Sequence, residues 1–303
     1  MKKFVLVACG LLVAVMDMGG RNTESSQLTG PYLGQKPPGE LPEAFAPSVI
    51  FSKNAVHGYI ALTPDGGEIY WIFLPPDPKN PPAINVIKQV NGHWAKPGIM
   101  EFTREYGVGS LFLSPDGRQL FFTSKRPWPD SWGKQPSGNQ LEAWKIWYVE
   151  RAGAGWGEPK PLDRRINQNI MGVSSTLDGT LYTDGIKRTK RKNGQYAEWE
   201  QLGHPLDVGK ILGGHPYVSP DESYVLFNRK WPGKFGYGIF VSYRTKDDRW
   251  TEPVNLLEKL GASRGGSQPI VTPDGKYLFC YSGGKFLWMD AKIIGDLKPK
   301  RLK

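Results

Sequence analysis

Short runs of apolar and β-branched residues recur along the chain, and a polar turn separates each run from a second one. The fourth copy shows the order most clearly, with runs over 214–218 and 223–227 on either side of the turn 219–222. A third run covers 238–243, and a fourth lies within 247–256. Apolar and polar residues that alternate between turn signals are typical of β-strands. The pattern therefore predicts repeated units of four short strands.

The turn between the first two strands of a unit has the same four-residue form in five places. Its copies begin at Thr63, Ser114, Thr176, Ser219 and Thr272, at intervals of 43 to 62 residues. Four copies have Pro in second place, all five have Asp in third place, and four end in Gly. Pro fixes φ, Asp accepts hydrogen bonds from nearby backbone N–H groups, and Gly adopts a positive φ. We therefore expect these aspartates to be turn formers and not catalytic acids.

A tryptophan recurs where the fourth strand of a unit is expected, at Trp94, Trp156, Trp199 and Trp250. We expect these rings to pack between neighbouring units. Repeated four-stranded antiparallel units are the blades of a β-propeller. Because the turn occurs five times, we predict an all-β fold, a five-bladed β-propeller of four-stranded antiparallel blades. Six blades are the alternative, because a count from sequence can miss one.

The last unit departs from the pattern, since it supplies only three strands within 269–290. The segment 291–298 that follows has the character of a short helix or a tail, and not of a fourth strand. The segment 42–50 near the start repeats the pattern of a fourth strand. We expect it to supply the missing outer strand and to close the ring without an unpaired edge. Leu177 replaces proline in the third turn, so the third blade is predicted to be irregular.

The composition is that of a folded soluble protein, with 39% hydrophobic and 22% charged residues among 303. The formal net charge is +10, and much of it lies in Lys2-Lys3, in 187–192 and in 298–303. Such a charge fits an anionic partner or simply a solvated basic surface. No nucleic-acid-binding motif is present, so we expect no nucleic-acid partner.

The N-terminus predicts export from a bacterial cell. Two lysines precede the apolar run 4–16, which is typical of a secretory signal and short for a membrane span. We assign 1–20 to this segment, 21–40 to an extended lead-in and 41–303 to one propeller domain. The residues around Cys9 match a lipobox, so lipidation at Cys9 and an uncleaved anchor are alternatives to simple export. The expected location is periplasmic or extracellular.

The repeats resemble those of the TolB-type, WD40-like β-propeller family of exported bacterial proteins. The stretches 114–122, 215–224 and 272–279 carry the resemblance, and the lead-in 32–39 is similar to stretches in single-propeller members. The resemblance covers about residues 30–298 and implies the propeller fold. It leaves the function open, because relatives include periplasmic binding subunits, propeller caps on serine peptidases and uncharacterised proteins.

Several catalytic motifs are missing from the sequence. It has no Gly-x-Ser-x-Gly, no His-Glu-x-x-His, no paired-cysteine motif and no Gly-rich phosphate loop. We therefore expect no cofactor and no metal site. Cys280 lies in an apolar strand and has no partner once Cys9 is removed, which excludes a disulfide framework. A buried, inert thiol is expected there.

The candidate site residues gather at one face of the predicted propeller. Strand one of each blade begins, and strand two ends, at the same face, which we call the blade-entry face. The candidate catalytic residues there are Glu105, Asp184 and His215. The candidate ligand-binding residues are Arg126, Arg229, His215, Arg264, Gln268 and Tyr106. Other polar residues expected at this face are His57, Asn169, Lys187 and Lys230.

These residues are mostly basic and polar, which suits a carboxylated or phosphorylated ligand. We therefore predict an exported, non-catalytic propeller that binds an envelope protein or an anionic glycan at this face. We expect a monomer, with a membrane tether through the N-terminus as an option. The alternative function is a carbohydrate-active enzyme, a glycoside hydrolase or a polysaccharide lyase, that acts in the central funnel.

Overall fold

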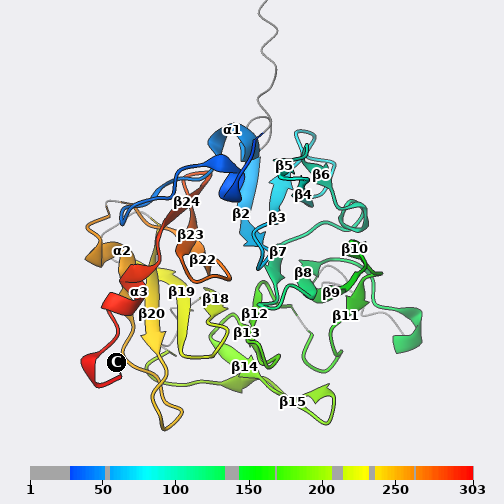
Figure 1. Ribbon diagram of the computed structural model, residues 1–303. Helices are drawn as coiled ribbons and strands as arrows, with labels where there is room; N and C mark the ends of the chain where they lie inside the picture. Colours follow the sequence, from blue (N-terminus) through cyan, green and yellow to red (C-terminus); the bar gives the residue numbers. More distant parts are fainter. Residues whose placement is uncertain are drawn as a thin grey trace, which may run out of the picture.

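Five antiparallel sheets surround a central axis in the computed structural model (Figure 1). The structure describes residues 28–51, 55–133, 143–167, 169–206, 214–231, 236–262 and 264–302. Each large sheet is one blade, so the predicted all-β, five-bladed propeller is confirmed.

The first two blades each contain four successive strands and a short extra piece. Their strands are β2 (Ala55–Leu62), β3 (Glu68–Leu74), β4 (Ala83–Val90), β5 (His93–Trp94), β6 (Gly98–Ile99), β7 (Ser110–Leu113), β8 (Gln119–Ser124), β9 (Lys145–Ala152), β10 (Gly155–Trp156) and β11 (Lys160–Pro161). Both β5 and β6 pair with β4, and both β10 and β11 pair with β9. The expected fourth strand is thus split, since Pro97 and Pro159 cannot donate to a ladder between the two pieces.

The third blade is the least regular, and the fourth has the predicted strand order. Their strands are β12 (Val173–Ser175), β13 (Leu181–Thr183), β14 (Lys187–Thr189), β15 (Arg191–Lys192), β16 (Gln195–Tyr196), β17 (Glu200–Gln201), β18 (Gly214–Val218), β19 (Tyr224–Lys230), β20 (Tyr237–Tyr243) and β21 (Val254–Asn255). The pair β15–β16 forms a separate two-stranded hairpin between the third and fourth strands of its blade.

The fifth blade joins the two ends of the described chain. Its strands are β22 (Ser267–Val271), β23 (Tyr277–Ser282), β24 (Lys285–Asp290) and β1 (Glu43–Ala44). In the register of this sheet Glu43 lies opposite Trp288 and Ala44 opposite Leu287. The prediction that the N-terminal segment supplies the missing outer strand is therefore confirmed.

The ring is closed at its centre as well. The innermost strands β2, β7, β12, β18 and β22 each contact the innermost strand of the next blade, and β22 contacts β2.

The helices of the described residues are all short and lie in the connections between strands. They are η1 (Pro31–Gly34), α1 (Pro47–Ile50), η2 (Glu101–Thr103), η3 (Asp130–Trp132), α2 (Leu256–Lys259), α3 (Lys292–Asp296) and η5 (Lys300–Leu302). The segment 291–298, for which a short helix or a tail is expected, contains α3.

The repeated turn has the hydrogen bonds expected of its residue types. In the second blade the Ser114 hydroxyl donates to Asp116 Oδ1 at 2.6 Å, and the Arg118 backbone N–H donates to the same oxygen at 3.0 Å. The other four turns repeat both bonds. In the first turn, the hydrogen bond from the Thr63 hydroxyl lowers the pKa of Asp65. The five aspartates are therefore turn formers, as predicted.

The third turn explains why its blade is irregular. In the other turns the first residue donates its N–H to the carbonyl five residues later, as Ser114 does to Gln119. In the third turn Thr176 donates to Thr180, one residue earlier. Leu177, which is 64% exposed, donates its own N–H to Pro220 of the next blade at 2.9 Å. A proline could not make that last bond.

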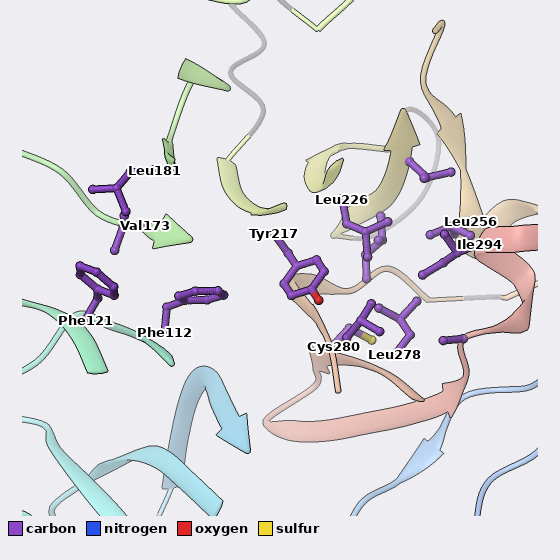
Figure 2. Close-up of a cluster of buried hydrophobic side chains, with 14 of the residues drawn as sticks. Phe112, Phe121, Val173, Leu181, Tyr217, Leu226, Leu256, Leu278, Cys280 and Ile294 are labelled. Carbon is purple, nitrogen blue, oxygen red and sulfur yellow. The ribbon is translucent and has the colours of Figure 1, made fainter. Parts of the chain in front are cut away.

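Apolar side chains fill the space between blades. One buried cluster extends from Phe112 in the second blade to Ile294 in α3 (Figure 2). Cys280 lies in this cluster, and burial raises the pKa of its thiol to about 12. Its predicted state as a buried, unreactive thiol agrees with this environment.

The recurrent tryptophans lie where blades meet. Trp156 of the second blade donates its Nε1–H to Tyr70 Oη of the first blade at 3.2 Å. Trp250 of the fourth blade packs edge-on against Tyr182 of the third, with ring centroids 6.4 Å apart. The predicted packing between blades is confirmed for these two rings.

The lead-in crosses the face that carries the five turns. Trp94 donates its Nε1–H to Gly30 O at 2.8 Å, and Tyr32 Oη donates to Asp274 Oδ2 in the fifth turn at 3.1 Å. The predicted export segment 1–20, with Cys9, lies outside the described residues. Within the described ranges, no helix is both long and apolar enough to cross a membrane.

Candidate functional site

The blade-entry face surrounds the mouth of the central channel. There, near the start of each innermost strand, a residue pairs with one near the end of the neighbouring strand, as Gly214 does with Asn228 and Ser267 with Tyr281. The five turns lie at the opposite face. Side chains from different blades thereby come together at the mouth.

One position of the innermost strand is central to this mouth. It lies four residues before the first residue of each turn and is occupied by Tyr59, Ser110, Gly172, His215 and Gln268. The strand register shifts close to this position in the first, fourth and fifth blades. His215 and Gln268 adopt positive φ values of 52° and 47°. Non-glycine residues resist this conformation, and such strain is often found at functional sites.

Six residues from four blades gather here, and we call them the mouth cluster: His57, Tyr59, Asp184, His215, Asn228 and Gln268. Tyr59 Oη and His215 Nδ1 are 2.5 Å apart, and their rings meet edge-on. The His215 backbone N–H donates to Asp184 Oδ1 at 2.7 Å, and His215 Nδ1 lies 3.8 Å from the same oxygen. His215 is therefore held from the first and third blades while belonging to the fourth.

Burial favours the neutral forms of three groups in the mouth cluster, His57, Tyr59 and His215. Burial lowers the pKa of His215, although Asp184 opposes this effect. Burial and the nearby His215 lower the pKa of His57. Burial, and then the charge of Asp184, raise the pKa of Tyr59 well above its usual value. At neutral pH the cluster thus offers two neutral imidazoles and a phenol beside one carboxylate.

Two glycines leave the room that this arrangement needs. A Cβ at Gly172 would lie 3.3 Å from His215 Nδ1, 3.5 Å from Tyr59 Oη and 3.6 Å from Asp184 Oδ1. A Cβ at Gly58 would come within 2.6 Å of Cδ of the Gln268 side chain. A side chain at position 58 would displace the Gln268 amide, and one at 172 would crowd the Tyr59–His215 contact.

Some polar atoms of the mouth cluster are not used within the protein. His57 Nδ1 is buried and has no hydrogen-bond partner. Asn228 is 4% exposed, and its Nδ2 donates to none of the described residues. A Cβ at Gly214 would lie 3.5 Å from that nitrogen. Buried polar groups are normally paired, so the unpaired Nδ1 of His57 indicates a ligand or water at the mouth.

A cavity of about 420 Å³ opens between the fourth and fifth blades, and we call it the Arg264 pocket. It is lined by Gly236, Tyr237, Arg264, Gly265, Gly266, Ser267, Tyr281, Ser282 and Gly283. Gly265 is needed here, because a Cβ would come within 2.3 Å of Tyr237 O. Tyr237 is 49% exposed, whereas Tyr281 Oη donates to Val56 O at 3.1 Å.

The basic candidates fall into two groups. Arg126 donates from Nη2 to Phe102 O at 2.7 Å, and its guanidinium lies 4.8 Å from the ring centroid of Tyr106. Arg126 is thus held by contacts within the first two blades. Arg264 and Arg229 lack a backbone hydrogen bond of this kind, although Arg229 lies over the ring of Phe240, and none of the three arginines forms an ion pair with any described residue. Lys187 and Lys230 at the same face are likewise without an ion pair in the described chain.

The candidate catalytic residues are also divided. Asp184 and His215 meet in the mouth cluster, whereas Glu105 is exposed and hydrogen-bonds with Tyr106, which raises the pKa of that phenol. No hydrogen bond, ion pair or ring contact joins Glu105 to the mouth cluster in the part of the chain described. Over those same residues, no group of three His, Cys, Asp or Glu side chains could hold a metal ion.

Four residues of the site were not among the candidates from sequence: Tyr59, Asn228, Tyr237 and Tyr281. Tyr59 could have been found by counting four residues back from each turn, which aligns it with His215 and Gln268. Asn228 carried no such signal, because its role depends on the strand register.

No protein-family model and no curated protein matches the sequence. Similar solved structures include a gluconolactonase from Xanthomonas campestris, with a TM-score of 0.45 and 12% identity over 84% of this chain and 94% of that one. A protein of unknown function from Dyadobacter fermentans has a TM-score of 0.45 and 12% identity, over 79% and 80% of the two chains. A GH43 endo-arabinanase from Bacillus licheniformis has a TM-score of 0.40 and 15% identity, over 78% and 94%.

At such TM-scores and identities these likenesses carry no information about activity. The propeller fold rests on the five blades themselves. The resemblance of the repeats to the TolB type stays a prediction from sequence.

Proposed function

We propose that this chain is an exported, non-catalytic β-propeller of the TolB type that binds an anionic ligand, a glycan or an envelope protein, at its blade-entry face. The observation that carries the proposal is the Arg264 pocket. Its exposed guanidinium has no carboxylate partner among the described residues, and it stands at a cavity of about 420 Å³.

The chemistry of the pocket favours a carboxylated glycan over a protein surface. A guanidinium binds a carboxylate through two parallel hydrogen bonds. Tyr237 adds a half-exposed ring with a hydroxyl, a combination that suits sugar rings. The volume also falls in the range of about 300–1,000 Å³ that is usual for small-ligand pockets. Arg229, Lys187 and Lys230 add unpaired positive charge around the mouth.

The test is calorimetric titration with a uronic-acid oligosaccharide and with a neutral oligosaccharide of equal length. We expect binding of the acidic ligand only, and Arg264→Ala with Arg229→Ala should weaken it by at least about tenfold, because charge-assisted hydrogen bonds are lost. Arg118→Ala is the matched control, since Arg118 is an exposed arginine at the opposite face. Binding that is unchanged in the double variant would remove the proposed site. If the oligosaccharides do not bind but an envelope protein is retained through the same arginines, the ligand is a protein.

One observation favours the alternative of a carbohydrate-active enzyme. His215 Nδ1 lies 3.8 Å from Asp184 Oδ1, so two titratable groups could reach one ligand atom. Glu105, the third candidate, lies outside this pair. Release of shorter products during the titration, abolished by Asp184→Asn, would establish the enzyme in place of the binding protein.

A further inference from the structure

We propose that the mouth cluster reads the hydroxyl groups of a single sugar ring, so that the ligand of the Arg264 pocket is an acidic sugar with its ring over the channel and its carboxylate at Arg264. This inference rests on the proposed function, because it assigns the second half of the same ligand. It goes further by stating which part of the ligand each group of residues recognises.

The two parts of the site are continuous. Ser267 lines the Arg264 pocket, and its hydroxyl donates to Oε1 of Gln268 in the mouth cluster. The backbone N–H of Gln268 lies 3.5 Å from Asn228 Oδ1. A chain of adjacent polar groups therefore leads from the wall of the Arg264 pocket to the centre of the mouth.

The charges of the two parts differ in a way that orients an acidic ligand. Asp184 is the one carboxylate of the mouth cluster, and the two histidines beside it favour their neutral forms. A ligand carboxylate placed there would lie beside the carboxylate of Asp184, which is only partly exposed, and this is unfavourable. At Arg264 the same carboxylate would find a cation. The neutral, hydroxylated part of the ligand is thereby left for the mouth.

The hydrogen-bonding groups of the mouth match hydroxyls, which both donate and accept. If Tyr59 donates to His215 Nδ1, the other ring nitrogen carries the proton and donates to the ligand. If Tyr59 donates instead to Met171 O, 3.3 Å away, His215 Nδ1 can donate to Tyr59 and Nε2 becomes an acceptor. His57 Nδ1 and Asn228 Nδ2 supply further unused polar atoms.

The site is built before the ligand arrives. Tyr59 and Asp184 fix His215 from two other blades, and the strand bulges aim His215 and Gln268 at the mouth with positive φ. The positive φ values of His215 and Gln268 cost free energy, and a channel that held only solvent would not need them. Groups fixed in advance lose little entropy on binding.

The channel is closed beneath the mouth, which limits how deep a ligand can go. Ile60, Phe112, Tyr217 and Ile270 of four innermost strands meet near the turns around a cavity of about 30 Å³. That space holds no more than a water molecule or two. A sugar ring must therefore stay at the level of the mouth cluster, within reach of the Arg264 pocket.

The experiment is a nuclear magnetic resonance titration of the full chain with three kinds of probe. The acidic sugars are D-glucuronate, D-galacturonate and D-mannuronate, the neutral probes are the matching hexoses, and acetate is the carboxylate alone. The chain has four histidines, so the imidazole signal of His215 can be assigned by its loss in His215→Asn. We expect at least one uronate to shift this signal and to bind at least about tenfold more tightly than acetate or its own hexose.

Variants separate the two halves of the ligand. His215→Asn and Tyr59→Phe should weaken uronate binding about tenfold and leave acetate binding unchanged, because contacts with the sugar hydroxyls are lost or misdirected. Arg264→Ala should lower the affinity for the uronate to the affinity for the matching hexose. His204→Ala, at an exposed histidine, is the matched control. The His215 signal of the unaltered chain gives a readout that does not depend on any variant folding.

Two outcomes overturn different statements. The inference fails, while the proposed function stands, if uronates bind no more tightly than acetate. It also fails if uronate binding depends on Arg264 but does not shift the His215 signal and is not weakened by His215→Asn. If uronate binding is independent of Arg264 and Arg229, the proposed function fails.

Discussion

The contact of 2.5 Å between Tyr59 Oη and His215 Nδ1 leaves Nε2 as the ring nitrogen of His215 that is free for a ligand. The contacts of this one side chain therefore determine which hydrogen bonds the site can offer. His215 contacts Tyr59, lies 3.8 Å from the carboxylate of Asp184, and acts electrostatically on His57. Burial lowers the pKa of His215 by more than Asp184 raises it, so the imidazole stays neutral at a pH at which an exposed histidine begins to take up a proton.

These shifts predict how stability depends on pH. The folded-state pKa values of His57 and His215 lie below the ordinary value of 6.5. The unfolded chain therefore binds more protons than the folded chain just below that value. The stability present above pH 6.5 should fall as the pH is lowered toward the folded-state values.

Urea unfolding between about pH 5 and about pH 7.5 would measure this loss. His57→Gln should flatten the curve, whereas His204→Ala, at an exposed site, should not. A pH slope that His57→Gln leaves unchanged would contradict the assignment.

At the scale of single elements, the repeated turn does two things at once. Its Ser or Thr and its Asp bond to each other and to the second strand, which fixes the register within the blade. Its second residue also faces the neighbouring blades: the turn prolines Pro115, Pro220 and Pro273 line the small cavity at the closed end of the channel. The third turn combines these tasks differently, since Leu177 bonds across to Pro220.

Replacing Leu177 with the proline found in the other turns should therefore destabilise the protein. Leu177→Pro removes an N–H that donates to Pro220 O at 2.9 Å, and the loss should be about 1 kcal/mol in the free energy of unfolding. Leu177→Ala keeps the N–H and is the matched control. Denaturant unfolding of both variants measures the difference, and a proline variant as stable as the alanine variant would show that the bond contributes nothing.

The whole molecule depends on the contact between its first and last strands. Phe45 follows β1, is 0% exposed, and packs against Phe279 and Trp288 with ring centroids 4.9 and 5.0 Å away. Its backbone N–H donates to Phe286 O at 2.9 Å. Phe45 is the fully buried one of three rings that join this segment to the fifth blade, since Tyr32 also packs against Tyr277 and Phe51 against Phe286.

Phe45→Ala should consequently cost about 3–5 kcal/mol in the free energy of unfolding, the usual range for a fully buried phenylalanine. Leu41→Ala lies just before β1 at a site that is 64% exposed, and it should change stability by less than about 0.5 kcal/mol. Urea unfolding gives both values. Equal effects of the two substitutions would mean that the closure does not depend on Phe45.

The fold could be predicted because its signals are local in sequence. The turns and the pattern of segment 42–50 depend on residue types within a few positions. The mouth could be predicted in part: His215 and Gln268 stand at a fixed distance from a turn, whereas Asn228 is brought to the site by strand pairing. The packing of Arg126 on Tyr106 depends on side-chain directions that no periodicity encodes.

The pairing of β1 with β24 also sets an order of events in folding. Residues 43–44 are made early, and their partners at 287–288 are made only when almost the whole chain exists. Four blades consist of strands that are close in sequence, so each can pair as soon as its own segment is available. The fifth cannot be completed in that way. Until β24 arrives, β1 lacks its partner and the ring has an open seam. A chain that must cross a membrane before it folds would gain from this arrangement, because the closed propeller cannot form on a partial chain.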